Sequence, residues 1–210
     1  MKAKVYSKNA KSTSTLKLPR EFSEEENLPL LAQAIRVYEA ASHPGLARVK
    51  TRAEVAISKR KIYKQKHTGR ARHGAKSAPI FVGGGIAHGP KGIKRELTMP
   101  IKMKRKALSV AMSLKAKKGQ VVAVGIDKIQ NTKEAGSLLD KIFLKEELKK
   151  GSNATLALSS KNWGVVRTKF RNIKNINIVL YKDLNAYNVF FGGLLIVDKE
   201  IFDKRVKDKK

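Results

Sequence analysis

The stretch GQVVAVGIDKIQNTKEAGSLLDKIFLKEELKKGSNATLALSS, residues 119–160, decides the fold. Its first apolar run, residues 121–126, is typical of a strand that is buried on both faces. Residues 132–150 follow with apolar side chains at helical spacing and end at Gly151, and residues 155–159 are expected to form the next strand. A strand–helix–strand order of this kind is typical of a largely parallel sheet with helices on both faces. The stretch therefore predicts the centre of an α/β fold.

The same alternation continues on both sides of this stretch. A helix is expected to begin at the N-cap Asn27 and to stop at His43-Pro44-Gly45, and another covers residues 101–118, with Gly119 as its C-cap. The remaining expectations are extended segments at residues 5–7 and 15–18, strands at 176–181 and 194–197, helices at 162–172, 184–191 and 199–206, and a frayed tail at 207–210. This order predicts a three-layer fold, a mostly parallel sheet with helices on both faces.

A long basic, glycine-rich segment interrupts this pattern after the first helix. Its centre carries eight cations and no acid, followed by a crowd of glycines from Gly69 to Gly92. The apolar residues are too sparse for a helix stripe or an alternating strand, and the segment cannot bury enough surface to offset its chain entropy. We therefore predict an irregular arm, residues 46–100, inserted into a globular body of residues 1–45 and 101–210. The two limbs of the arm would double back on each other, and the arm would order on a polyanion.

The charge balance indicates the class of partner. The chain has 46 Lys and Arg against 17 Asp and Glu, a formal charge of +29, and residues 55–126 hold 18 of the cations with the single acid Glu96. Such a local concentration is typical of a nucleic-acid-binding surface. A merely soluble basic surface and a surface for anionic lipid are the alternatives. Lipid binding normally uses a basic amphipathic helix, which the arm does not contain.

The absence of cysteine, of a signal core and of a membrane-length apolar run indicates the cellular compartment. Without cysteine there are no disulfides and no thiolate metal ligands, which fits a reducing compartment. No apolar signal core follows the first residues, and the longest apolar run, residues 189–197, is interrupted by Gly192 and Gly193. That run is far shorter than the ~20 residues of a membrane helix. We expect a cytoplasmic protein that does not enter a membrane.

The arm offers partial matches to two kinds of binding site, a phosphate-binding loop and a zinc site, and each lacks residues that it needs. Residues 83–92 resemble a phosphate-binding loop, but Pro90 stands where its lysine belongs and Gly92 where its Ser or Thr belongs. His67, His73 and His88 have no cysteine or carboxylate nearby that would complete a zinc site. We therefore predict no metal and no cofactor.

An enzyme is the alternative from another class, because α/β sheets often carry active sites at the carboxyl ends of their strands. The candidates there are Asp127, Ser159, Ser160 and Asp183. No nucleophile elbow, dinucleotide fingerprint or acid–base pair accompanies them. We predict no catalytic residue, and Asp127 is better explained as a turn residue.

The arm side chains instead suit RNA. Arg70 and Arg72 can hold phosphate through two hydrogen bonds, and the three histidines can stack on a base or donate to a phosphate. Tyr63, Phe81 and Ile62 are candidates for stacking or wedging between bases. For Phe81, packing against the arm's own base is the alternative.

The motifs of the arm also resemble a known family. These are TRAEV at residues 51–55, KQKHTGRARHG at 64–74, SAPIF at 77–81, GGG at 83–85, AHGP at 87–90 and KMKRKAL at 102–108. Together with the α/β pattern they are similar to the bacterial family of large-subunit ribosomal protein four, over essentially the whole chain. The family usually has Pro and Trp where Ile62 and Tyr63 stand, and Gly where His67 stands.

The resemblance implies a structural role in the cytoplasmic large ribosomal subunit. Members bind large-subunit rRNA, assist assembly, and place the arm tip in the peptide exit tunnel beside the L-twenty-two family protein; no homo-oligomer is expected. By residue matching, the tip comprises Tyr63, Lys64, Gln65, Lys66, His67, Thr68, Gly69 and Arg70. The full set of expected RNA contacts is Arg48, Arg52, Lys59, Arg60, Lys61, Lys64, Gln65, Lys66, Thr68, Gly69, Arg70, Arg72, His73, Lys76, His88, Lys91, Lys104 and Arg105. The alternative is a repressor of its own operon that binds messenger RNA through the body.

Overall fold

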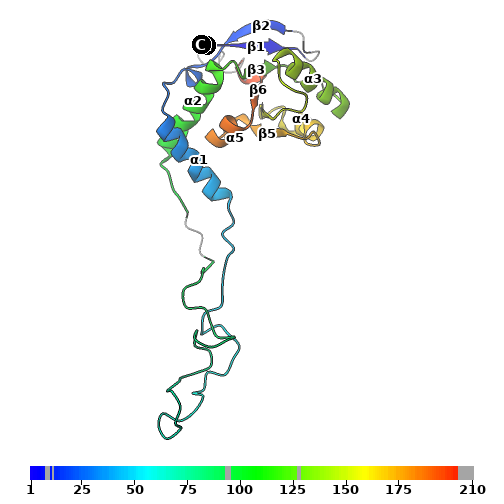
Figure 1. Cartoon of the computed structure of the whole chain (residues 1–210). Coiled ribbons are helices and arrows are strands. Elements are labelled where there is room, and N and C mark those ends of the chain that lie inside the picture. The colour runs from blue at the N-terminus through cyan, green and yellow to red at the C-terminus, as the bar shows by residue number, and fades with distance from the viewer. Residues whose placement is uncertain (8–9, 11, 93–95, 127–128, 203–210) are drawn as a thin grey trace. The chain divides into compact units, whose positions relative to one another are not determined.

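The computed structural model describes residues 1–210 except 8–9, 11, 93–95, 127–128 and 203–210. The chain divides into two compact units. The first unit comprises Met1–Glu39 and Thr98–Lys210, and the second unit comprises Ala40–Leu97. All the strands of the sheet lie in the first unit (Figure 1).

The first unit is built on a six-stranded sheet of order β2-β1-β3-β6-β4-β5. Its strands are β1 (Lys2–Tyr6), β2 (Ser12–Lys17), β3 (Val121–Val124), β4 (Ala154–Leu158), β5 (Ile176–Leu180) and β6 (Leu194–Asp198). Only the pair β1–β2 is antiparallel. Every residue of β3, β4 and β6 is buried, because these central strands are covered on both faces.

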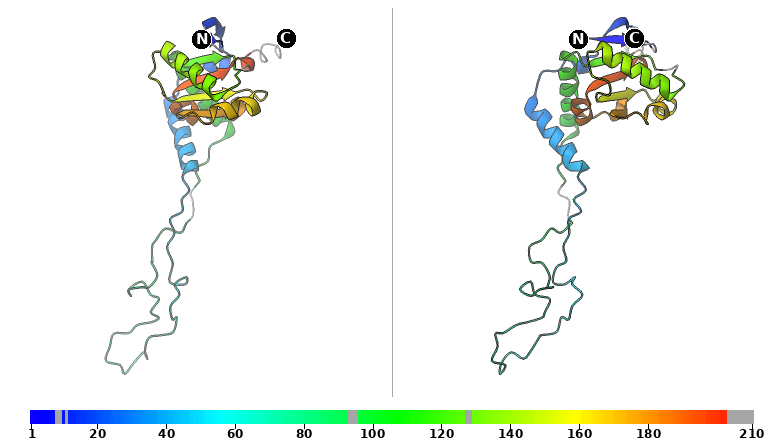
Figure 2. Two further views of the ribbon diagram at one scale, coloured as in Figure 1. Left: turned by 90° about the vertical axis from the view of Figure 1, so that its right-hand side faces the viewer. Right: turned by 45° about the vertical axis from the view of Figure 1, so that its right-hand side comes forward.

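Helices cover both faces of this sheet, so the predicted three-layer α/β body is confirmed (Figures 1 and 2). One face packs against α1 (Leu28–Ser42), α2 (Ile101–Lys117), α5 (Ala186–Phe191) and the short 3-10 helix η1 (Arg20–Phe22). The other face packs against α3 (Thr132–Lys145) and α4 (Trp163–Phe170). A second 3-10 helix, η2 (Tyr181–Asp183), follows β5. The helical residues 199–202 follow β6; the rest of the helix expected at 199–206, and the tail at 207–210, lie outside the described residues.

The helix ends show which local signals were decisive. The Leu30 N–H donates to Asn27 Oδ1 over 3.0 Å, which confirms the N-cap of α1. Gly119 at φ 68° closes α2 as predicted. The prediction that α3 runs to residue 150 was wrong: the helix ends at Lys145. Glu147 adopts φ 57° there, and the Leu148 N–H bonds back to the Phe143 carbonyl, which is a Schellman closure without glycine.

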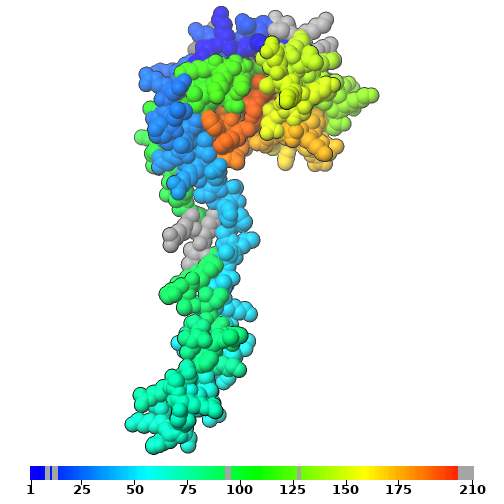
Figure 3. Space-filling model, viewed as in Figure 1, coloured from blue at the N-terminus to red at the C-terminus, as the bar shows by residue number. Residues whose placement is uncertain are grey.

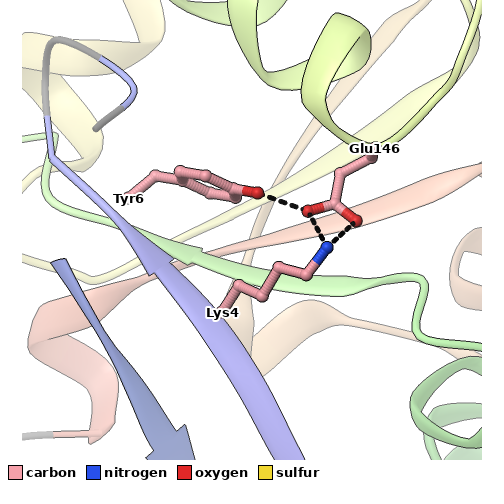
Figure 4. A network of polar contacts seen from close by, with 3 residues as sticks. All are labelled: Lys4, Tyr6 and Glu146. Atoms are coloured by element: carbon pink, nitrogen blue, oxygen red, sulfur yellow. Dashed lines mark hydrogen bonds and ion pairs between the residues drawn. The ribbon is translucent and has the colours of Figure 1, made fainter. Parts of the chain in front are cut away.

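A polar network joins β1 to the end of α3 (Figure 4). The Tyr6 hydroxyl donates to Glu146 Oε1 over 2.5 Å, and Lys4 Nζ lies 3.0 Å from both carboxylate oxygens of Glu146. Tyr6 is only 2 % exposed. Burial, and then the hydrogen bond to the Glu146 carboxylate, raise the pKa of the Tyr6 hydroxyl. The hydrogen bond donated by the buried Tyr6 hydroxyl therefore links β1 to the C-terminal end of α3.

A buried lysine anchors the turn that precedes β6. Lys115 Nζ donates to the Gly193 carbonyl over 2.8 Å and to Gln120 Oε1 over 3.1 Å. Burial lowers the pKa of this amine, since the charged form loses water. Lys115 lies on α2, so its contacts link that helix to the Gly192–Gly193 turn after α5.

Candidate nucleic-acid interface

The second unit is a pair of antiparallel limbs that contains no strand or helix beyond the end of α1 among its described residues. The bridges Arg48–Lys91 and Lys61–Ala75 join the limbs near the two ends of the pairing. Between them the Ile86 N–H donates to the Lys50 carbonyl over 3.0 Å. The space-filling view shows the two limbs of this unit in contact (Figure 3). The doubling back expected from the sequence is therefore present.

A local turn orders the first limb. Thr51 and Glu54 form a hydrogen-bonded turn, in which Glu54 Oε2 accepts the Thr51 N–H over 3.1 Å and the Glu54 N–H bonds to the Thr51 carbonyl. Arg48 forms an ion pair with the other oxygen of Glu54. The Thr51 N–H and the Arg48 guanidinium lower the pKa of the Glu54 carboxyl. Arg48, an expected RNA contact, is thus held by an acid of its own limb.

Glycines bring the limbs together at two positions. A Cβ on Gly85 would lie 2.3 Å from the Arg52 nitrogen, and a Cβ on Gly89 would lie 2.0 Å from Val49 Cγ2. In the structure the two glycines serve close approach between the limbs, a contact that sequence spacing alone does not reveal.

The backbones of Arg48, Lys50, Lys61 and Lys91 take part in the pairing, while most cationic side chains of the second unit are open to solvent. All eight between residues 59 and 76 are exposed, and none forms an ion pair within the described residues. Lys61 donates to the amide oxygen of Gln65. Arg52, His88 and Lys91 are exposed as well. The paired backbone therefore carries exposed positive side chains that have no acidic partner among the described residues, and such side chains can bind phosphate groups. The eight cations are Lys59, Arg60, Lys61, Lys64, Lys66, Arg70, Arg72 and Lys76.

The comparison with known proteins agrees with this chemistry. Residues 16–207 match the model of the ribosomal protein L4/L1 family. The chain belongs to that family. It is 36% identical to a large ribosomal subunit protein uL4 of Thermus thermophilus, over 90% of this chain and 91% of that protein. The proteins of the same name from Aquifex aeolicus and Treponema denticola are 34% and 35% identical, over 85% and 94% of this chain and 88% and 92% of their own lengths.

Membership of the ribosomal protein L4/L1 family confirms the resemblance seen in the sequence. It is a family of ribosomal proteins, a structural and non-enzymatic kind of protein. Across the described residues, no helix has both the length and the apolar character needed to cross a membrane. In the same residues no three His, Asp or Glu side chains gather to hold a metal ion.

The expected arm tip contains two departures from the pattern that the resemblance implies, Tyr63 and His67, and the backbone at His67 suits the glycine expected there. His67 adopts φ 66°, and Gly69, two residues on, adopts φ 63°. Both lie in the left-handed region, which is unstrained for glycine and unfavourable for histidine. Around them Lys64, Gln65, Thr68 and Arg70 are exposed.

The aromatic side chains expected to stack on bases are partly used within the second unit. Tyr63 donates its hydroxyl to the Ala71 carbonyl and meets His73 edge to face, with ring centroids 6.2 Å apart. His73 meets Phe81 in the same way at 5.1 Å. These three rings are half-buried, and Phe81 packs against His73 of the same unit, whereas Ile62 is exposed. The sequence did not single out the exposed apolar side chains Ile80, Val82 and Ile86.

The remaining candidates lie in the first unit. Lys104 is half-buried and Arg105 exposed on α2. The Ser159 N–H donates to Asp198 Oδ2 over 3.3 Å, and the fully buried Asp198 also accepts from the Asn162 amide and the Glu200 N–H. These bonds give Asp198, which the sequence did not single out, a structural role at the ends of β4 and β6.

The structure describes two of the three other positions considered for an enzyme. Ser160 is exposed, Asp183 lies in η2, and Asp127 lies outside the described residues.

Proposed function

We propose that this chain is a structural constituent of the large ribosomal subunit, which binds large-subunit rRNA through the arm and assists assembly of the subunit. The observation that carries the proposal is the set of eight exposed cations without acid partners on the paired limbs. Facing strands of rRNA repel each other, and a segment such as residues 59–76, which carries cations and no acid, lowers that repulsion as helices close around it. The names of the relatives, large ribosomal subunit protein uL4, support the same assignment.

Within that role, the tip at residues 63–70 would line the peptide exit tunnel beside the L-twenty-two family protein. The left-handed positions His67 and Gly69 support a sharp reversal of the chain at the tip. The expected partners are large-subunit rRNA and neighbouring ribosomal proteins in the cytoplasm, with one copy of the chain in each particle. Phosphate contacts would fix the position of the arm, and unpaired bases would supply specificity.

A second function is carried by the body. Repression of the protein's own operon through messenger RNA would use the first unit, whose α2 also presents Lys104 and Arg105. This alternative does not require the arm, and that difference makes the two functions separable.

Deletion of residues 59–91 in cells that depend on this chain separates the functions. The assembly role predicts accumulation of incomplete large subunits. The repressor role predicts that repression of the operon survives the deletion. Normal subunit assembly in the deletion strain, with the shortened chain present in the particles, would contradict the proposed role of the arm.

A further inference from the structure

A pocket of about 340 Å³ opens on the first unit where β4 and β5 begin. The turn after α5 closes one side of it. Three asparagines and one phenylalanine are among the residues that line it. The lining residues are Asn153, Ala154, Asn175, Ile176, Asn177, Phe191 and Gly192.

The frame of this pocket is fixed by hydrogen bonds. The Asn153 carbonyl accepts the Leu194 N–H over 3.1 Å, and the Asn175 carbonyl accepts the Ala154 N–H over 3.1 Å. The Asn175 side chain donates to the Gly151 carbonyl over 2.7 Å, which holds Asn175 at φ 65°. Gly192 lies against β4 so closely that a Cβ would approach Thr155 Oγ1 to 1.8 Å. The pocket is therefore a formed feature of the backbone.

Two of the asparagines have no evident structural task. Within the described residues, the side chains of Asn153 and Asn177 form no hydrogen bond. Asn177 lies in the edge strand β5, whose other residues are all apolar, and asparagine is unfavourable in strands. An amide offers donors and an acceptor side by side, which is the complement of a nucleobase edge. Asn177 is exposed on this edge strand, so its amide is open to a ligand with such an edge.

The ring of Phe191, at one side of the pocket, could stack against the flat face of a nucleobase. Phe191 is 51 % exposed at the end of α5. Its ring is held by Tyr187 and Phe190, each with a centroid 5.1 Å from its own. Exposed cations stand on the two loops that frame the pocket, Lys149 before Gly151 and Lys174 before Asn175. An aromatic platform with amides and nearby cations is how proteins hold unpaired bases.

We propose that this pocket binds an unpaired nucleobase of RNA, with the base stacked on Phe191 and its edge bonded to the amides of Asn177 and Asn153. That the ligand is RNA rests on the proposed function. The site itself uses only the first unit and is independent of the eight arm cations. A polar peptide of a neighbouring protein would need no stacking platform, so the nucleobase is the ligand that accounts for both groups of side chains.

The test compares a short single-stranded RNA with an abasic RNA of the same backbone, each bound to the full chain. The wild-type chain should prefer the RNA that carries bases. Phe191→Leu and Asn177→Val should each reduce that preference about fivefold or more, since one stacked base contributes on that scale. Valine is more favourable than asparagine in a strand, so unfolding would not explain a reduced preference for RNA with bases in Asn177→Val. Leu144→Ala removes an exposed apolar side chain of α3 and should leave the preference unchanged.

The outcomes separate this site from the function of the arm. If both pocket variants keep the wild-type preference for bases while the chain still binds large-subunit rRNA, the pocket proposal is wrong and the arm proposal stands. If the variants lose a neighbouring ribosomal protein instead of the base preference, the pocket is a protein contact and the proposal is overturned. Failure of the wild-type chain to bind rRNA at all would overturn both.

Discussion

Changing Gly85 to alanine should open the paired limbs of the second unit. The added Cβ would lie 2.3 Å from the Arg52 nitrogen, 2.5 Å from the Arg52 Cα and 2.5 Å from the Thr51 carbonyl carbon. All three atoms belong to the backbone, so no side chain can rotate away. Ordinary carbon contacts lie near 3.5–4.0 Å, and the limbs would have to separate by about 1 Å or more.

The expected cost follows from the hydrogen bonds that such a separation breaks. The Ile86 N–H donates to the Lys50 carbonyl over 3.0 Å, and the Val49 N–H donates to the Pro90 carbonyl over 3.1 Å. At about 0.5–1.5 kcal/mol each, their loss costs about 1–3 kcal/mol. If RNA binds the limbs in their paired form, affinity for large-subunit rRNA should fall by roughly 5- to 150-fold.

The measurement is the dissociation constant of the full chain for a large-subunit rRNA fragment at fixed salt. Gly74→Ala is the matched control, because a Cβ there meets nothing within 4 Å and its φ is not positive. The control should bind like the wild type. Equal affinities for Gly85→Ala and Gly74→Ala would refute the inference that limb pairing matters for binding.

Three further predictions concern single side chains. Glu146→Ala should lower the free energy of unfolding, measured in urea, by about 2–3 kcal/mol, because it leaves the buried Tyr6 hydroxyl without its charged acceptor. Lys4→Met should lower it by under about 1 kcal/mol, since the Lys4–Glu146 ion pair is half exposed. Equal losses for the two variants would contradict the role given to the Tyr6–Glu146 hydrogen bond. Tyr6→Phe should flatten the pH dependence of stability above pH 10. In the wild-type protein the unfolded chain loses the Tyr6 proton near the ordinary pKa of 10.0, whereas the folded chain, in which this pKa is raised, keeps the proton, so the free energy of unfolding falls as pH rises. An unchanged slope in the variant would show that Tyr6 is not protected. His67→Val should bind rRNA about fivefold more weakly than His67→Gly, since a β-branched residue is strained at φ 66°, and equal binding would mean that the tip changes conformation on RNA.

The sequence predicted the body well because its signals are local and consistent. Four consecutive buried residues in β3, the N-cap Asn27 and the C-cap Gly119 each specify their element without help from distant contacts. The end of α3 was missed because a left-handed glutamate, Glu147, closes it where glycine at 151 was the stronger signal.

The candidate site was predictable in its charge and less so in its geometry. Acid-free runs of Lys and Arg are visible in the sequence, and so is the family resemblance. The roles of Gly85 and Asp198 depend on partners far along the chain, which no local pattern identifies. The edge-to-face row of Tyr63, His73 and Phe81 likewise arises only when the limbs pair.

The contact between the arm cations and RNA phosphates is tested most directly by a salt series. The slope of log affinity against log salt for a large-subunit rRNA fragment would be compared between the wild-type chain and a variant with the eight cations of residues 59–76 changed to glutamine. A second variant would carry eight such changes at exposed cations of the first unit. Each lost phosphate contact reduces the slope by about 0.7–0.9. If most of the eight bind phosphate, the arm variant should lose about 4 or more from the slope and the control clearly less. Equal slopes for the wild-type chain and the arm variant would contradict the proposed role of the arm.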